Sequence, residues 1–407
     1  MDRLLIKAPS NPLQGKIHLP GSKSISNRVL IMRALANADT QIQNLSISDD
    51  TVILNRILSH PGPEFNAGHA GTSYRFSTAY FAVKEGEQIL TGSERMLQRP
   101  IGPLVEALNS IGADITYLAE EGYPPLKIGS FKSQQKIEID IDSSMSSQYI
   151  SALCMIAPVL PKGLTINLKG RTVSRPYLDM TLSLMRHFGI QIEEIGNQIL
   201  IDHQDYNVND FTVESDWSAA SYYFSLVASS VGSEITLSAL FENSLQGDSA
   251  IVKLAEPFGV HSEFNNGTLK LRQSDSEFSN IQIDFLEVPD IAQTFAVMAA
   301  MQGKALELRN LDTLVIKETD RIKALQIELA KCGVQFRQLI DYDYVVDGKI
   351  EKGNFQFATY DDHRMAMAFA PIALLSDIII EEPQVVSKSY PGFWQDLENL
   401  GFILEWM

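Results

Sequence analysis

The sequence predicts an α/β protein of two domains, each made of three repeated units. One compound pattern, a helix followed by a short strand, a polar loop, a second helix and further strands, returns about every 70 residues. The first helix of each copy is apolar on all sides, which indicates burial, and a glycine follows the second helix in most copies. Buried helices covered by sheets and by outer amphipathic helices explain these observations together.

The first helix of each unit opens on Ser, Thr or Asp, residues that satisfy the free N–H groups of a first turn. Small and apolar residues then dominate each segment. In the first unit, either Ser22 or Ser24 is the expected cap. The six helices are predicted over residues 24–36, 72–83, 146–159, 216–228, 290–301 and 361–374.

The second half of each unit reads as a short strand, a polar loop, an amphipathic helix and a strand that begins at glycine. The clearest copies span residues 89–118, 166–195, 306–339 and 378–406. A glycine just beyond a helix suits a left-handed C-terminal cap. The glycines at this position are Gly112, Gly189, Gly259, Gly333 and Gly401. Six units divide naturally into two groups of three, and the polar stretch His203–Asp216 marks the expected border and hinge.

Composition and charge exclude several classes of protein. The chain has 407 residues, of which 45% are hydrophobic and 20% charged, so it can bury large cores. A net charge of −17 argues against nucleic acid and anionic membranes as partners. The N-terminus lacks an apolar signal core and the longest apolar run, Met365–Leu375, is too short to span a bilayer, so we expect a cytoplasmic protein. Cys154 and Cys332 are predicted to be buried, inert thiols.

Polar residues recur at the starts of helices, at the same phase of one unit after another. The segment Leu19–Arg28 places Lys23 and Arg28 beside a helix N-terminus, an arrangement that favours an anion. Because the same phase recurs in both halves, we expect the set to bind a small polyanion in a cleft between the domains. The set comprises Lys23, Ser24, Arg28, Gly71, Thr72, Arg75, Arg95, Arg99, Ser146, Ser147, Gln148, Ser174, Arg175, Tyr177, Asp290, Lys317, Glu318, Arg321, His363, Arg364 and Lys388.

Each of these motifs also has an ordinary structural interpretation. The segment Lys317–Arg321 can be read as a helix cap with a surface pair, and Asp216, Asp290 and Asp361 as plain N-caps. Coincidence across so many loops at one phase favours the shared site. No histidine pairs with another at ligand spacing, so we expect no metal site. The histidines read as structural or solvated are His18, His60, His69, His187, His203 and His261.

Eight motifs, in this order along the chain, carry a family resemblance: LPGSKSISNR, AGTSYR, ERMLQRPIG, SSQYISALCMIAP, SRPYLDMT, KETDRI, DDHRMAMA and SKSYPGFW. Through them the chain resembles the 5-enolpyruvylshikimate-3-phosphate synthase (3-phosphoshikimate 1-carboxyvinyltransferase) family of enolpyruvyl transferases. The resemblance implies two inside-out α/β domains of three βαβαββ units each, closing on substrates in the interdomain cleft. It implies transfer of the enolpyruvyl group of phosphoenolpyruvate to the 5-hydroxyl of shikimate 3-phosphate, on the pathway to chorismate and the aromatic amino acids. A monomer without cofactor is expected.

Carried over by motif, the resemblance assigns residues to each substrate. Those for shikimate 3-phosphate are Lys23, Ser24, Arg28, Ser146, Ser147, Gln148, Ser174, Tyr177, Asp290 and Lys317. Those for phosphoenolpyruvate are Lys23, Gly71, Arg99, Gln148, Arg321, Arg364 and Lys388, a cation density suited to a small trianion. Glu318 is the implied proton donor to the methylene carbon of phosphoenolpyruvate. Asp290 is the implied acceptor of the 5-hydroxyl proton, with Lys23 as the alternative.

The resemblance also gives domain bounds and shows three departures. Residues 21–213 are implied to form the domain that mainly binds shikimate 3-phosphate. Residues 1–20 with 214–407 are implied to supply the acid, the base and the phosphoenolpyruvate groups. His69 and Thr313 stand where asparagine is common in the family, so neither is assigned to the site, and Phe76 stands where proline is common.

Three other functions agree less well with the sequence. A sister transferase acting on UDP-N-acetylglucosamine is the alternative, but it typically uses a cysteine in the loop that here reads RMLQRPIG. A P-loop enzyme is rejected because five residues separate Gly15 from Gly21 and a serine precedes Lys23. A noncatalytic anion-binding protein is disfavoured by the presence of both Glu318 and Asp290.

Overall fold

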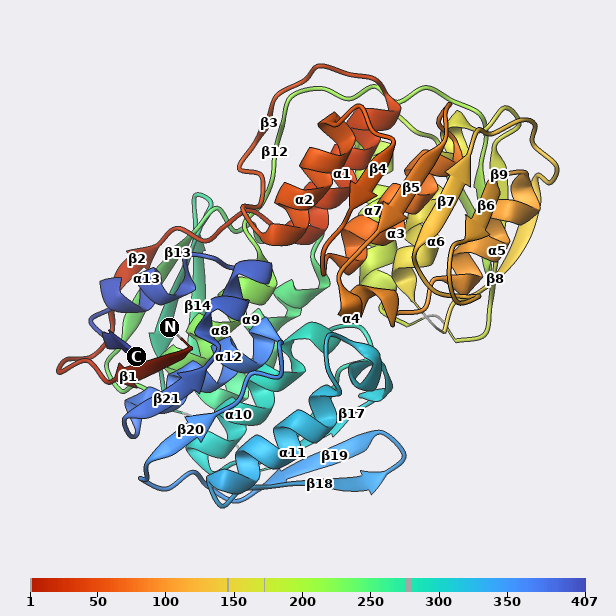
Figure 1. Cartoon of the computed structure of the whole chain (residues 1–407). Coiled ribbons are helices and arrows are strands. Elements are labelled where there is room, and N and C mark those ends of the chain that lie inside the picture. The colour runs from red at the N-terminus through yellow and green to blue at the C-terminus, as the bar shows by residue number, and fades with distance from the viewer. Residues whose placement is uncertain (1, 145, 172, 276–279) are drawn as a thin grey trace. The chain divides into compact units, whose positions relative to one another are not determined.

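The computed structural model describes residues 2–144, 146–171, 173–275 and 280–407 (Figure 1). The chain forms two compact units, one of residues 21–213 and one of residues 1–20 with 214–407. The second unit is therefore discontinuous in sequence. Among the described residues, every helix is too short or too polar to cross a membrane.

The unit of residues 21–213 mixes helices with short strands. Its helices are α1 (Lys23–Leu35), α2 (Asp49–Ser59), α3 (Gly71–Ala82), α4 (Glu94–Leu97), α5 (Gly102–Ile111), α6 (Ser147–Ile156) and α7 (Arg175–His187). Its strands are β3 (Ile42–Gln43), β4 (Glu64–Asn66), β5 (Gln88–Thr91), β6 (Asp114–Tyr117), β7 (Leu126–Gly129), β8 (Glu138–Asp142), β9 (Leu164–Lys169), β10 (Glu193–Ile195), β11 (Gln198–Ile201) and β12 (Phe211–Thr212).

The unit of residues 1–20 and 214–407 has the same mixture. Its helices are α8 (Trp217–Ala228), α9 (Ile251–Leu254), α10 (Ala292–Gln302), α11 (Arg321–Lys331), α12 (His363–Phe369) and α13 (Phe393–Asn399). Its strands are β1 (Arg3–Lys7), β2 (Gln14–Ile17), β13 (Glu234–Ser238), β14 (Val260–Asn265), β15 (Thr268–Gln273), β16 (Asn280–Asp284), β17 (Ala305–Arg309), β18 (Gln335–Ile340), β19 (Asp343–Asp347), β20 (Phe355–Phe357), β21 (Ile378–Glu381) and β22 (Ile403–Trp406).

The strands form several small sheets with a common pattern. The four-stranded sheets have the orders β4-β5-β7-β6, β8-β9-β11-β10, β2-β13-β15-β14, β16-β17-β19-β18 and β20-β21-β1-β22. In each, the first pair is parallel and the next two pairs are antiparallel. A two-stranded parallel sheet joins β3 to β12. Apolar residues alternate along these strands, as in β9, where Leu164, Ile166 and Leu168 are buried.

The helices predicted to be buried form the core of each unit. In one unit α1, α3 and α6 contact one another, and in the other α8, α10 and α12 do so (Figure 1). Each begins within two residues of its predicted start, and α8 is buried over nearly its whole length because Ala, Tyr, Phe and Leu surround its axis. Each unit thus has its own hydrophobic core.

Local predictions about caps and cysteines are also confirmed. The five glycines predicted to follow second helices all have positive φ, from 76° at Gly333 to 113° at Gly112. Ser22, one of the two expected caps of the first helix, accepts a hydrogen bond from the backbone N–H of Ile25. Both Cys154 and Cys332 are buried free thiols.

Candidate active site

The first predicted anion-binding loop opens α1 and carries Lys23. Ser22 caps the helix, so Lys23 occupies its first turn with its side chain 17% exposed. The Nζ of Lys23 lies 3.2 Å from Oδ2 of Asp50, at the start of α2. The α1 N-terminus and this ammonium therefore present positive charge together, with one carboxylate beside them.

Arg28 lies one turn further along α1 and is only 2% exposed. Its Nε donates to Oγ1 of Thr181 at 2.7 Å, and its Nη1 donates to the carbonyl of Ser24 at 2.9 Å. Its Nη2 donates to Oγ of Ser151 and to the carbonyl of Tyr177, at 3.3 and 3.1 Å. Burial lowers the pKa of Arg28 to about 10, so the guanidinium stays charged at neutral pH. All four acceptors are uncharged oxygens, so these contacts do not neutralise its positive charge.

The predicted serines lie at the N-terminal ends of two helices that contact each other, α6 and α7. Ser146 is the N-cap of α6 and Ser147 is its first residue. Ser174 occupies the N-cap position of α7 with φ of 52°, and Tyr177 lies in the first turn. The partial positive charge at such helix ends favours a bound anion.

Gln148, in the first turn of α6, is held in one orientation by two neighbours. Nη1 of Arg75 donates to Oε1 of Gln148 at 2.7 Å, and Nε2 of Gln148 donates to Oγ1 of Thr72 at 3.1 Å. Arg75 also lies 5.4 Å from the ring centroid of Tyr149, whose hydroxyl donates to the carbonyl of Pro100 at 2.6 Å. The amide of Gln148 is thereby tied to α3, and its neighbour Tyr149 is tied to the loop that follows Arg99.

The structure brings Gly71 and Arg99 into contact. A Cβ atom at Gly71 would lie 2.3 Å from Nη1 of Arg99. The absence of a side chain therefore lets the guanidinium lie against the first turn of α3, where free N–H groups are located. Two residues assigned to the same substrate, from loops 28 positions apart in sequence, thus adjoin each other.

Arg321 is the centre of the second group of site residues, in the unit of residues 1–20 and 214–407. It is the first residue of α11 and is 1% exposed. Its Nη2 lies 2.6 Å from Oε2 of Glu318 and its Nη1 lies 3.2 Å from Oδ1 of Asp290. Its Nε lies 2.8 Å from Oδ2 of Asp362. Burial lowers the pKa of Arg321, but the charges of Asp362 and Glu318 outweigh it, so the net shift is upward.

Asp290 is shared by three cations. Besides Arg321, its carboxylate lies 3.5 Å from Nζ of Lys317 and 3.1 Å from Nη2 of Arg364. Arg364 also donates from Nη1 to the backbone carbonyl of Asp290 at 2.9 Å. The predicted acid, the predicted base and two further predicted cations, Lys317 and Arg364, are therefore joined in one ion-pair network with Arg321.

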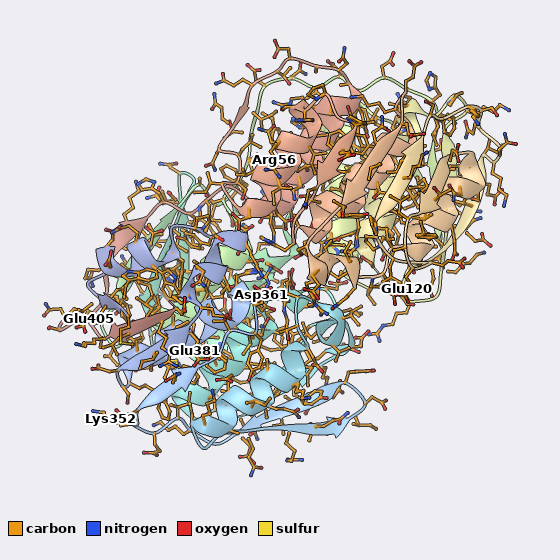
Figure 2. All side chains as sticks on the ribbon, viewed as in Figure 1. Arg56, Glu120, Lys352, Asp361, Glu381 and Glu405 are labelled. Atoms are coloured by element: carbon orange, nitrogen blue, oxygen red, sulfur yellow. The ribbon has the colours of Figure 1, made fainter. Side chains whose placement is uncertain are left out.

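Lys388 binds the loop between β20 and α12. Its Nζ donates to the backbone carbonyl of Asp361 at 2.6 Å and also to the Asp361 carboxylate; Asp361 is labelled in Figure 2. Tyr360 and Asp361 both have left-handed backbones, with φ of 55° and 56°. Such conformations cost about 1 to 3 kcal/mol each in residues other than glycine. Asp362, next in sequence, accepts the hydrogen bond of Arg321.

The cap interpretation fails for two of the three acids to which it applied. Asp216 does cap a helix, since its side chain accepts a hydrogen bond from the N–H of Ala219 in α8. Asp290 lies in a 3₁₀ turn and binds cations, and the N-cap of α12 is Asp362 instead of Asp361.

Arg175 is held by Asp179 and Glu194 of its own unit.

Four partners of the predicted site residues were missed from the sequence. Asp362 follows Asp361 at a predicted helix start, which was an available signal for a partner of Arg321. Asp50, the partner of Lys23, lies in α2, a helix that was not predicted from the sequence. No sequence signal pointed to Ser218 or Asp248, because each lies far in sequence from Arg364. The Nη2 of Arg364 donates to Oγ of Ser218 at 3.4 Å, and that hydroxyl donates to Oδ2 of Asp248.

Asp248 is a buried acid beside the network. Burial, with the neighbouring charge of Asp290, raises the pKa of Asp248 to about 7. The folded protein therefore holds this proton more tightly than the unfolded chain does, so stability is lost as pH rises toward 7. We expect Asp248→Asn, which has no such proton, to become more stable relative to the wild type between pH 5 and pH 8. Urea unfolding at both pH values measures this, and an unchanged difference would contradict it.

The three departures from the family pattern have distinct surroundings. Nε2 of His69 lies 3.6 Å from Oδ2 of Asp49. Phe76 is fully buried in α3, with its ring centroid 5.4 Å from Cζ of Arg28. Thr313 is 9% exposed in a 3₁₀ turn before Lys317. In the described part of the chain, His, Cys, Asp and Glu side chains do not gather in groups of three or more able to hold a metal ion.

Comparison with known proteins gives a consistent answer. A family described as EPSP synthase (3-phosphoshikimate 1-carboxyvinyltransferase) matches residues 7–65 and 55–397. A 3-phosphoshikimate 1-carboxyvinyltransferase of Bacteroides fragilis is 45% identical over 404 residues, 98% of each chain. One from Photobacterium damsela subsp. piscicida is 37% identical over 423 residues, 96% of this chain and 98% of its own. An EPSP synthase structure from Acinetobacter baumannii has a TM-score of 0.81 at 20% identity, over 100% of both chains. The chain therefore belongs to the EPSP synthase (3-phosphoshikimate 1-carboxyvinyltransferase) family.

Proposed function

We propose that the chain transfers the carboxyvinyl group of phosphoenolpyruvate to the 5-hydroxyl of shikimate 3-phosphate, with release of phosphate. The observation that carries the proposal is the network around Arg321, which joins the acid Glu318 to Asp290 and to two further cations. An addition and elimination reaction needs this combination, because a proton must be added and removed beside a polyanionic substrate. The names of the curated relatives support the same reaction.

The proposed chemistry proceeds through a tetrahedral intermediate. Glu318 gives a proton to C3 of phosphoenolpyruvate, and the 5-hydroxyl oxygen bonds to C2 while its proton passes to Asp290 or Lys23. C3 then loses a proton, the bond between C2 and the phosphate oxygen breaks, and phosphate leaves. Positive groups next to the departing phosphate stabilise its charge. Arg364, which has a bidentate guanidinium, is suited to that task.

The groups for each substrate are proposed as carried over from the family motifs. Phosphoenolpyruvate is bound by Lys23, Gly71, Arg99, Gln148, Arg321, Arg364 and Lys388. Shikimate 3-phosphate is bound by Lys23, Ser24, Arg28, Ser146, Ser147, Gln148, Ser174, Tyr177, Asp290 and Lys317. The buried, uncompensated charge of Arg28 and the helix ends that carry the serines support the second set.

Beyond the observed sheets, we propose an architecture of two domains with three repeat units each. Residues 21–213 are proposed to form a domain of three βαβαββ units that mainly binds shikimate 3-phosphate. Residues 1–20 with 214–407 are proposed to form a like domain that supplies acid, base and phosphoenolpyruvate groups. We propose an inside-out arrangement, in which both domains bind one substrate pair in a cleft. Both units contain four-stranded sheets with one parallel and two antiparallel pairs, and this common pattern supports the proposed repeat. One chain carries both sets of groups, so a monomer is proposed. As its location we propose the cytoplasm, as expected from the sequence.

Release of inorganic phosphate from phosphoenolpyruvate tests the proposed function. We expect release with shikimate 3-phosphate as acceptor, and none with UDP-N-acetylglucosamine or with phosphoenolpyruvate alone. The assay runs in excess chelator, where activity is expected to persist because the proposed chemistry uses no metal. Release with UDP-N-acetylglucosamine alone would overturn the assignment, and reversible loss on chelation would reveal a metal requirement.

A further inference from the structure

The loop between β20 and α12 needs support that its own sequence does not provide. Tyr360 and Asp361 are consecutive residues with left-handed backbones, a conformation that residues other than glycine keep only where surrounding contacts impose it. Asp361 accepts the hydrogen bonds of Lys388, and Asp362 accepts that of Arg321. The position of two proposed phosphoenolpyruvate-binding cations is therefore linked to this strained loop.

Glu328 provides contacts of the required kind. It is fully buried in α11, and its carboxylate accepts a hydrogen bond from the hydroxyl of Tyr360 at 2.6 Å. The other carboxylate oxygen accepts from the backbone N–H of Ala358 at 3.2 Å and from Nζ of Lys331 at 2.6 Å. Burial and the neighbouring carboxylate raise the pKa of Tyr360, so its hydroxyl keeps the proton that it donates.

Glu328 and Arg321 lie on the same face of α11. They are seven residues apart, which is close to two helical turns, and both are buried. Glu328 contacts the loop at Ala358 and Tyr360, whereas Arg321 contacts it at Asp362. One helix therefore holds the strained pair from both sides, and Asp361 lies between the two points of attachment.

We propose that Glu328 is a positioning residue for the reaction, fixing the loop of residues 358–362 so that Lys388 and Arg321 are placed for phosphoenolpyruvate. The identity of that anion rests on the proposed function. A carboxylate is an expensive group to bury, and here it satisfies three donors from a helix, a backbone and a tyrosine. An apolar residue would fill the same space but would leave the Ala358 N–H and the Tyr360 hydroxyl without this acceptor.

Two variants test the proposal in the full chain. Tyr360→Phe removes one hydroxyl and leaves the bond between Glu328 and Ala358 intact. Glu328→Gln keeps the size of the side chain but replaces one accepting carboxylate oxygen by an amide NH2 group. That NH2 group cannot accept the hydrogen bonds that the carboxylate oxygen accepts. Tyr206→Phe is the matched control, because it removes a buried hydroxyl that donates to the carbonyl of Met155 at 2.7 Å in the other unit.

The kinetic expectation is a selective effect on one substrate. We expect KM for phosphoenolpyruvate to rise about tenfold in both variants, the effect of one lost hydrogen bond. KM for shikimate 3-phosphate should stay within about twofold, and Tyr206→Phe should leave both values unchanged. Equal rises in both KM values, or a lower melting temperature with unchanged KM values, would show a merely structural role and overturn the proposal.

Amide hydrogen exchange gives a readout that does not require activity. The N–H of Asp362 donates to the carbonyl of Thr359 within the loop, and Tyr360→Phe leaves both of those groups in place. We expect exchange at Asp362 to accelerate about tenfold or more in Tyr360→Phe and Glu328→Gln, and not in Tyr206→Phe. Unchanged exchange in both would overturn the positioning role. A wild type that releases no phosphate would instead refute the proposed function, and exchange alone would then decide the role of Glu328.

Discussion

A Glu318→Gln variant is expected to turn over about 10² to 10⁴ times more slowly than the wild type, the usual contribution of a positioned acid and base. The carboxylate of Glu318 is fixed by Nη2 of Arg321 at 2.6 Å, and the amide oxygen of glutamine can accept the same hydrogen bond. Substrate affinity should therefore change only by a modest factor. The amide, however, has no acidic proton to give to C3 of phosphoenolpyruvate. Steady-state phosphate release, measured as kcat and as both KM values, separates these effects.

Deuterium exchange and a nearby control make this test specific. In heavy water the wild type should introduce solvent deuterium into the vinyl group of the product, and the glutamine variant should lose exchange together with turnover. Asp320→Asn makes the same change from acid to amide at the exposed N-cap of α11, two residues away, and should keep its kcat. If Glu318→Gln turns over and exchanges like the wild type, Glu318 has a structural role. Lys23 then becomes the next candidate for the proton.

An Arg321→Met variant is expected to lose about 3 to 5 kcal/mol of unfolding free energy, together with its activity. Arg321 is 1% exposed and neutralises carboxylates of Asp290, Glu318 and Asp362. Removing one partner of a buried ion pair leaves uncompensated charge, which is why the loss is large. Urea unfolding at neutral pH measures it.

Arg175→Met is the control for this prediction. Arg175 also contacts two carboxylates, those of Asp179 and Glu194, but its side chain is 34% exposed. Exposed ion pairs contribute about 0 to 1 kcal/mol, so a small loss is expected. A loss of similar size in both variants would show that burial is not the cause. A stable, fully active Arg321→Met would remove the network from the proposed site.

Local sequence signals predicted the buried helices and the glycines that end helices, because the forces that determine these features are local. The apolar segment 217–228 forms a buried helix since no side of it favours water, and Gly112 and Gly401 end or follow helices because glycine accepts positive φ without strain. The position of the motif KETDR at a helix start likewise selected Glu318 and Arg321, which are three residues apart and in contact. These features depend on neighbours within a few residues.

The partners that give the site its electrostatics could not be predicted in the same way. Arg28 contacts Thr181 and Ser151, which are 153 and 123 residues away in sequence. Asp248 approaches Arg364 through Ser218, and no periodicity relates these segments. Such contacts depend on how separate helices pack. Burial then decides the pKa of each group, and burial is a property of the assembled unit.

The place of β1 in its sheet has a consequence for synthesis of the chain on the ribosome. This strand, Arg3–Lys7, lies between β21 (Ile378–Glu381) and β22 (Ile403–Trp406), so both of its partners are made long after it. Residues 21–213 form a contiguous unit and can fold once they emerge. Strand β1 must meanwhile wait, with both edges unpaired, until β21 and β22 have been translated. Its pairing is then a late, long-range step, and loss of the final strand by premature termination would leave an exposed edge able to join another chain.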